Sequence, residues 1–215
     1  MRERRKVAAV VNDFLSEVDG LLRLDALNQK RYRTGRGRPN ASQLTKGQMC
    51  LITEGIFTRA FSSYELFLED AFILYVRGRP TQSGRIVESY LRPRNTTHAR
   101  EMIKSQMTFL EWNSPDNVIE RADTYLGDNN PVKLAISTNR ARLSIMRKVR
   151  NAIAHRSTQA RTQFASVVTQ ELMAPPLMMP SPGEFLLMTD PRSRTSYFLV
   201  EYMSVLKSVA VIVAG

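Results

Sequence analysis

Residues 52–72 read ITEGIFTRAFSSYELFLEDAF, and this stretch decides the fold class. Apolar and aromatic side chains recur at steps of three and four residues, the spacing that gathers them on one face of an α-helix. The complete face consists of Ile56, Phe57, Ala60, Phe61, Tyr64, Phe67, Leu68, Ala71, Phe72 and Tyr75. A stripe this wide is typical of the core of a helical bundle. We therefore expect a long buried helix with Ser42 as its N-cap and Gly78 at its C-terminal end.

The same periodicity predicts further helices on both sides of this segment. They cover residues 5–32, 97–112, a segment that begins at 115, 138–156 with a continuation to about 172, and 196–213. A short helix is expected at 86–91 and a short strand or extended piece at 184–188. Residues 174–183 should form a loop whose apolar side chains lie on the body of the protein. The sequence thus predicts one all-α domain over residues 1–215, a helical bundle with irregular insertions and a C-terminal extension.

Composition and charge indicate the class of partner. The chain has 215 residues, of which 43% are hydrophobic, so a core of normal extent can form. Lys and Arg number 31 against 20 acidic residues, a net charge of +11 that favours polyanions through counterion release. We expect nucleic acid as the partner, while anionic lipid fits the charge less well because no strongly basic amphipathic helix is present. The basic segment 30–40, KRYRTGRGRPN, is expected to be either a solvated loop or an arm that grips RNA.

Several classes of protein are disfavoured by what the sequence lacks. Cys50 is the single cysteine and the chain has two histidines, so neither an internal disulfide nor metal-ligand spacing is available. We expect no metal, no cofactor, and a buried Cys50 that acts as a small hydrophobe. The N-terminus lacks the apolar core of a secretory signal, and the apolar run 203–215 is too short to span a bilayer. These features predict a cytoplasmic protein that does not use a membrane.

The run Arg150-Asn151-Ala152-Ile153-Ala154-His155 is the strongest candidate for chemistry. An arginine stays charged at any working pH, and an imidazole can hold or release a proton near neutrality. Together they suffice to cleave RNA through its own 2′-hydroxyl without a metal. On an ideal helix Arg150 and His155 point about 140° apart, whereas Asn151 and His155 share a face. A compact site therefore needs two copies of the helix about a two-fold axis, or a helix that loosens near Ala154.

Arg-Asn-x-x-x-His at the end of a helix resembles the signature of the HEPN superfamily. Residues 52–72, with the aromatic–acid pair Tyr64-Glu65, are similar to the preceding helix of these proteins. The resemblance spans about residues 43–156 and suggests the RiboL-PSP or a related prokaryotic HEPN subgroup. The N-terminal helix, the insertion at 113–131 and the proline-rich C-terminal segment are not diagnostic of any subgroup.

The resemblance implies a helical bundle that forms a homodimer in which both motifs meet at the interface. It implies a metal-independent endoribonuclease, commonly a toxin or phage-defence effector, with RNA as substrate and an antitoxin or regulatory partner as a further expectation. Arg150 would hold the scissile phosphate, His155 would act as general base or acid, and Asn151 would orient His155 or the phosphate.

Four further residues are candidates for supporting roles. Arg147, Lys148 and Arg156 border the motif and could add phosphate contacts. Glu65 either pairs with a cation such as Arg150 or is an ordinary solvated side chain.

Two alternatives to catalysis stay open at this point. The first is that Arg150 pairs locally and His155 is an exposed histidine at the end of a helix. The other histidine, His98, is expected to be an ordinary surface residue in a capping-type loop. The second is a non-catalytic HEPN module that binds nucleic acid or nucleotide, or mediates dimerisation.

Overall fold

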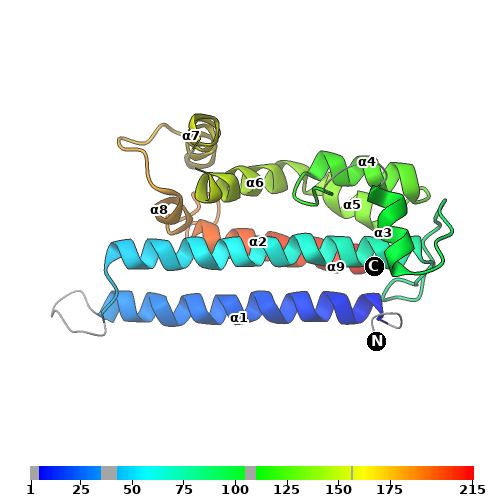
Figure 1. The fold of residues 1–215 in the computed structure, drawn as a ribbon. Coiled ribbons are helices and arrows are strands. Elements are labelled where there is room, and N and C mark those ends of the chain that lie inside the picture. The colour runs from blue at the N-terminus through cyan, green and yellow to red at the C-terminus, as the bar shows by residue number, and fades with distance from the viewer. Residues whose placement is uncertain (1–4, 35–42, 105–109, 156) are drawn as a thin grey trace. The chain divides into compact units, whose positions relative to one another are not determined.

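The computed structural model (Figure 1) describes residues 5–34, 43–104, 110–155 and 157–215. Within these ranges the chain forms nine α-helices and isolated β-bridges but no sheet, which confirms the predicted all-α fold. The helices are α1 (Val7–Thr34), α2 (Lys46–Val76), α3 (Thr96–Lys104), α4 (Pro115–Tyr125), α5 (Pro131–Thr138), α6 (Arg140–Ala154), α7 (Thr158–Leu172), α8 (Pro182–Leu186) and α9 (Phe198–Ala214). Of the helices described, none is long and apolar enough to cross a membrane.

The chain divides into two compact units, each made of separate stretches of sequence. Unit 1 contains the residues up to Ser16, Ser62–Ser144 and Val205–Gly215, and unit 2 contains Glu17–Phe61 and Ile145–Ser204. Helices α1, α2, α6 and α9 therefore each contribute one segment to each unit. The single domain expected from the sequence stays a prediction.

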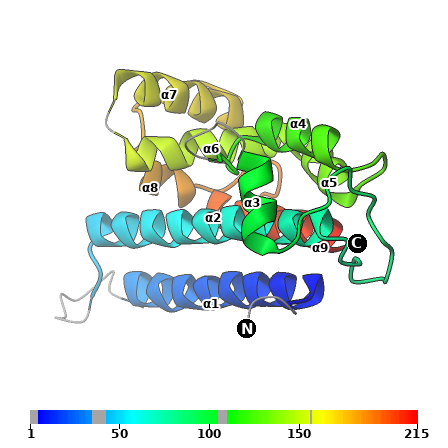
Figure 2. The ribbon, with the colours of Figure 1, turned by 45° about the vertical axis from the view of Figure 1, so that its right-hand side comes forward.

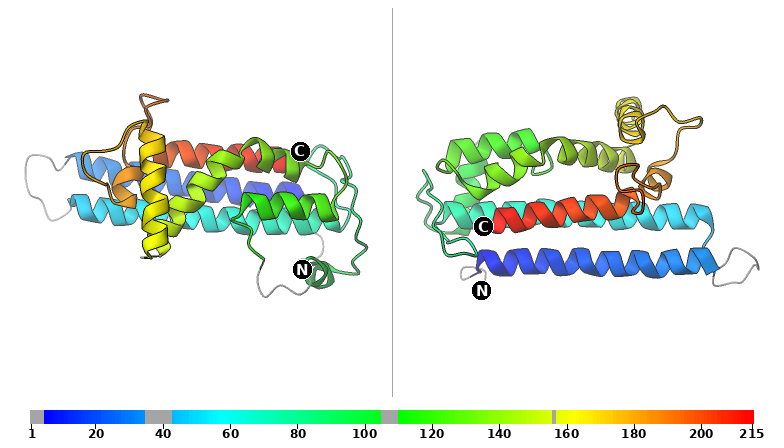
Figure 3. Two further views of the ribbon diagram at one scale, coloured as in Figure 1. Left: turned by 90° about the horizontal axis from the view of Figure 1, so that it is seen from above. Right: turned by 180° about the vertical axis from the view of Figure 1, so that it is seen from behind.

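The core of unit 1 is formed by its segments of α1, α2 and α9, which run side by side (Figures 1 and 3). Phe14 of α1 stacks on Phe67 of α2 with 5.2 Å between ring centroids. The Tyr75 hydroxyl of α2 donates a 2.5 Å hydrogen bond to the Val213 carbonyl of α9. The predicted aromatic stripe of α2 is thus core, and its burial joins three segments that are distant in sequence.

The C-terminal end of α2 follows the sequence prediction. Gly78 has φ +69°, its N–H donates to Tyr75 O at 2.8 Å, and Arg79 N–H donates to Leu74 O at 2.9 Å. This pair of bonds is a Schellman motif, which requires the left-handed conformation that glycine adopts most readily. The predicted N-cap, Ser42, lies outside the described residues.

Helix α3 lies beside the end of α2 in unit 1 (Figure 2). Arg100 of α3 donates to Glu69 at 2.7 Å and to Asp70 at 3.2 Å, both on α2. Asp70 also accepts from Arg5 at 2.7 Å, so one carboxylate ties the start of α1 to α3. The predicted helix 97–112 is too long, because α3 ends at Lys104 and residues 110–112 are not helical.

The segment between α2 and α3 corrects a further expectation. Residues 86–91 are not helical. Ser89 forms an antiparallel bridge with Leu126, and Tyr90 N–H donates to Tyr125 O at 3.0 Å. Ser89 and Tyr90 thus have backbone partners 37 and 35 residues away in the sequence, and pairing with a distant segment prevents a local helix.

Helices α4 and α5 show what capping signals can and cannot predict. Helix α4 begins as expected, with Ser114 as N-cap and Pro115 in the first turn. Residues 126–130 separate α4 from α5, a helix that the periodicity of the sequence did not predict. Asn130 caps α5 by accepting from Lys133 N–H at 2.8 Å.

The core of unit 2 is an aromatic cluster around Phe185. Its ring stacks on Phe198 at 4.4 Å and meets Phe164 edge-on at 5.7 Å. Tyr202 of α9 contacts Phe57 of α2 at 6.0 Å between centroids. The cluster therefore joins α2, α7, α8 and α9, and α9 is the closing helix predicted from the sequence.

The short strand expected at 184–188 is instead part of α8 and the turn after it. Ser181 and Glu184 form a reciprocal capping box, so the helix is specified locally. A Cβ atom on Gly183 would lie 2.6 Å from the Cys50 carbonyl oxygen, which shows how closely α8 packs on α2. Cys50 is buried, as expected.

The loop before α8 also differs from its prediction. Leu177, Met178 and Met179 are exposed to solvent and do not lie on the body of the protein.

A guanidinium clamp fixes α7 in unit 2. Arg192 binds both carboxylate oxygens of Glu171 on α7, at 2.7 and 3.2 Å, and donates from Nε to Asp190 at 2.9 Å. Both carboxylates are buried, and the Tyr202 hydroxyl donates to Glu171 at 3.2 Å. These bonds raise the pKa of Arg192. One cation thus compensates two acids and links α7 to the segment that leads into α9.

We expect Arg192→Met to lower the free energy of unfolding by about 3 kcal/mol, because two buried carboxylates lose their cation. The value is at the low end for a buried pair because the Arg192 side chain is 44% exposed. Urea unfolding followed by circular dichroism measures it. Arg161→Met on the exposed face of α7 is the control and should change stability by less than about 0.5 kcal/mol. Equal stability of the two variants would contradict the clamp.

Asp25 of α1 is another buried acid in unit 2, in addition to Glu171 and Asp190. It accepts a hydrogen bond from the Tyr197 hydroxyl, but burial raises the pKa of its carboxyl more than this bond lowers it. The folded protein therefore holds this proton to a higher pH than the unfolded chain does. Consequently the contribution of Asp25 to stability decreases as the pH rises above about 4, where an aspartate in an unfolded chain ionises.

Asp25→Asn should remove that decrease, because an amide does not ionise. We expect the variant to gain stability relative to the wild type as the pH rises from about 4 toward neutrality. Chemical denaturation at a series of pH values tests this, with Asp19→Asn on the same helix as the control. A difference between wild type and Asp25→Asn that does not vary with pH would disprove the assignment.

Candidate functional site

The motif lies at the C-terminal end of α6, which crosses from unit 1 into unit 2. In unit 2 the helix is anchored by Ile145, Met146 and Val149, all buried. Its sequence, RARLSIMRKVRNAIA, carries five basic residues and no acidic residue. The apolar face of α6 is therefore packed inward, and the basic residues lie on the other faces of the helix.

Arg150 and Asn151 are in contact. Both side chains are partly buried, and Arg150 Nη1 donates to Asn151 Oδ1 at 3.3 Å. The contact restrains the guanidinium near the end of α6. The structure brings the Asn151 side chain to Arg150, and its expected role of orienting His155 or a phosphate stays a prediction.

His155 is the first residue beyond α6. The helix ends at Ala154, two residues before the predicted end, and His155 N–H makes a final 2.9 Å bond to Asn151 O. The imidazole is exposed. Because His155 lies outside the regular helix, the 140° separation expected on an ideal helix does not fix the direction of its side chain.

Helix α7 begins at Thr158, three residues after His155 in the sequence. Ser157 is its N-cap and accepts from Ala160 N–H at 3.2 Å. The chain changes direction sharply between α6 and α7 (Figure 3, left). In the sequence, His155 therefore lies between the last residue of α6 and the N-cap of α7. The sequence contains this cap, Ser157, although one helix was predicted to continue through it.

The remaining predicted site residues are placed as follows. Arg147 and Lys148 are partly exposed on α6 in unit 2, one turn before the motif. Arg156 lies outside the described residues, as does most of the basic segment 30–40. Glu65 is partly buried on α2 in unit 1, whereas Arg150 belongs to unit 2, so their pairing stays a prediction.

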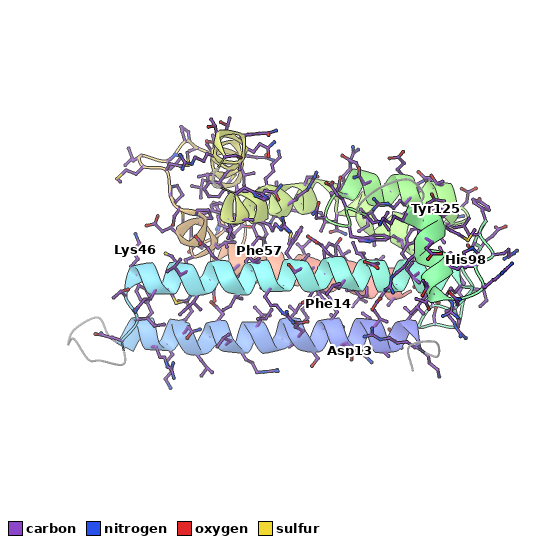
Figure 4. The ribbon with its side chains drawn as sticks, in the orientation of Figure 1. Asp13, Phe14, Lys46, Phe57, His98 and Tyr125 are labelled. Atoms are coloured by element: carbon purple, nitrogen blue, oxygen red, sulfur yellow. The ribbon has the colours of Figure 1, made fainter. Side chains whose placement is uncertain are left out.

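His98 has a local structural role in unit 1. Its Nδ1 accepts from Arg94 N–H at 3.1 Å, and its own N–H donates to Asn95 Oδ1 at 2.8 Å. These bonds cap the start of α3. His98, labelled in Figure 4, therefore lies in the first turn of a helix and is not the ordinary surface residue of a loop that the sequence predicted.

No cluster of three or more His, Cys, Asp or Glu side chains able to hold a metal ion occurs among the residues that the structure describes.

Comparison with known proteins gives no relative. No protein-family model, no characterised protein and no solved structure matches this chain.

Ser157→Ala should destabilise α7 by about 1 kcal/mol, because the first turn loses its side-chain cap. The loss is expected as faster hydrogen exchange at Ala160 N–H and a lower free energy of unfolding. Ser166→Ala, on the exposed middle of α7, is the matched control and should be neutral or slightly stabilising. If the two variants behave alike, Ser157 does not cap α7.

Proposed function

We propose that the protein is a metal-independent endoribonuclease of the HEPN type, with Arg150, Asn151 and His155 as its catalytic residues. The observation that carries the proposal is the arrangement at the end of α6. A partly buried guanidinium is held by Asn151, and an exposed imidazole follows one residue after the helix ends. One group is suited to hold a phosphate and the other to exchange a proton with an incoming ribose.

The proposed reaction begins with attack of a ribose 2′-oxygen on the adjacent phosphorus. The imidazole of one His155 accepts the 2′-hydroxyl proton while the guanidinium of Arg150 stabilises the negative charge that develops on the phosphoryl oxygens. The bond from phosphorus to the 5′-oxygen then breaks, and a protonated imidazole supplies the proton that this oxygen needs. The products are a 2′,3′-cyclic phosphate and a 5′-hydroxyl, so no water or metal is consumed in this step.

A homodimer fits this chemistry better than a single chain. The reaction needs one base and one acid, and each chain offers one histidine in the motif. Two copies of the end of α6 about a two-fold axis would supply both. We propose such a dimer with a shared site, acting on RNA in the cytoplasm as a toxin or phage-defence effector under the control of an antitoxin or regulatory partner.

The first experiment measures cleavage of a single-stranded RNA in excess EDTA. The wild type should cut it, His155→Ala should lower the rate by about 10²- to 10⁴-fold, and Arg150→Ala by about 10³-fold. Arg150→Lys should restore little, because a lysine cannot hold a phosphate through two parallel hydrogen bonds. Mass spectrometry of the wild-type products should find cyclic phosphate and 5′-hydroxyl ends.

Arg161→Ala is the control, since it removes an exposed cation from α7 without altering the motif. It should cut at the wild-type rate. Equal rates of cleavage by His155→Ala and the wild type would contradict the catalytic assignment. A wild type that binds RNA and never cuts it would favour the non-catalytic HEPN module instead.

A further inference from the structure

The loop between α2 and α3 in unit 1, residues 77–95, is rich in arginine. It contains Arg77, Arg79, Arg85, Arg92 and Arg94 against a single acid, Glu88. Arg85, Arg92 and Arg94 are exposed. Among the described residues none of these three guanidiniums forms an ion pair, in contrast to Arg100 just beyond the loop. The loop therefore presents three uncompensated cations to solvent.

The backbone of this loop is held at several points within unit 1. Gln82 and Ser83 donate to the carbonyls of Ala214 and Gly215, at 2.8 and 3.0 Å. Farther along, Tyr90 N–H donates to Tyr125 O.

The second half of the loop is fixed from two further sides. Gly127 N–H donates to Glu88 O at 2.9 Å, and Arg94 N–H donates to His98 at 3.1 Å. His98 and Tyr125, which receive two of the loop's bonds, lie at the same end of unit 1 (Figure 4). Because the backbone is already ordered, a ligand would not have to fix it on binding.

The loop also carries an aromatic residue, Tyr90, between Arg85 and Arg92 in the sequence. Tyr90 is 58% exposed, although its backbone is bonded to α4. An exposed ring between arginines is the arrangement on which unpaired bases stack while guanidiniums bind the flanking phosphates.

A hollow of about 720 Å³ lies where this loop meets the start of α1. Lys6 and Arg79 line it together with Arg5, and no carboxylate is among its lining residues. Arg5 is paired with Asp13 and Asp70, so Lys6 is a cation of this hollow that could meet a ligand. The volume is within the range of small-ligand sites, and Gly84, the neighbour of Arg85 in the sequence, also lines the hollow.

We propose that the α2–α3 loop is a binding surface for single-stranded RNA, with phosphates on Arg85, Arg92 and Arg94 and a base stacked on Tyr90. This surface would hold the substrate of the proposed ribonuclease. The inference rests on RNA as the substrate class of the proposed function, but not on the cleavage chemistry. Arginine favours nucleic acid over an anionic membrane here, because its planar guanidinium binds phosphate through two hydrogen bonds and stacks on bases.

The test measures binding of wild-type protein to a fluorescent single-stranded RNA whose 2′-hydroxyls are all methylated. This RNA lacks the nucleophile, so the result does not depend on whether the protein cuts RNA. Anisotropy titrations over a series of salt concentrations should give a linear plot of log K against log salt. Arg85→Ala/Arg92→Ala/Arg94→Ala should reduce the slope by about 2, since each lost phosphate contact lowers it by about 0.7.

Tyr90→Ala should weaken binding about tenfold and leave the slope unchanged, because stacking releases no counterions. Two matched controls accompany these variants. Arg23→Ala/Arg161→Ala/Arg194→Ala removes the same charge from exposed positions of unit 2, and Leu134→Ala removes an exposed apolar side chain from unit 1. Both should bind close to the wild type once circular dichroism has shown that all variants fold.

Two results would overturn the inference. One is an equal loss of slope in both triple variants, which would mean that net charge alone attracts RNA. The other is unchanged RNA binding by the loop variant together with lost binding to phosphatidylcholine–phosphatidylserine vesicles, which would identify a lipid surface.

Discussion

Burial of α2 is the constraint on which the rest of the structure depends. One face of this helix carries aromatic and aliphatic side chains through most of its length, and each unit packs on its own segment of that face. Phe67 stacks on α1 in unit 1, and Phe57 packs against α9 in unit 2. Removal of this much apolar surface from water is the dominant favourable contribution to folding, so the other helices are positioned by their fit to α2.

Polar groups then determine how the helices around this core begin, end and stay in place. The candidate site depends on two such details in unit 2. Helix α6 ends at Ala154 and α7 begins under the Ser157 cap, which leaves His155 in the short connection. The far end of α7 is fixed by Arg192 through Glu171. The imidazole of His155 is exposed to solvent, with which it can exchange a proton.

Charge is distributed over both units and is not confined to the motif. Helix α6 carries basic residues without acids, and the α2–α3 loop presents uncompensated arginines on an ordered backbone. If the protein acts on RNA, α6 would carry the cleavage site and the α2–α3 loop would bind phosphates away from it. Such distant phosphate contacts supply affinity without touching the reacting atoms. The excess charge would also speed the encounter with a polyanion.

The sequence by itself determined the all-α fold, the long helices, the C-terminal glycine of α2 and the burial of Cys50, because helical periodicity and capping are local properties. It also contained the capping box of α8 and the cap of α7, neither of which was predicted. Only the tertiary structure decided that residues 86–91 are not helical, since the backbone partners of Ser89 and Tyr90 are Leu126 and Tyr125. Likewise, the contact of Arg150 with Asn151 and the ordered backbone of the α2–α3 loop depend on side-chain packing and on hydrogen bonds between distant segments. A periodic pattern specifies which face of a helix is buried but carries no information about such partners.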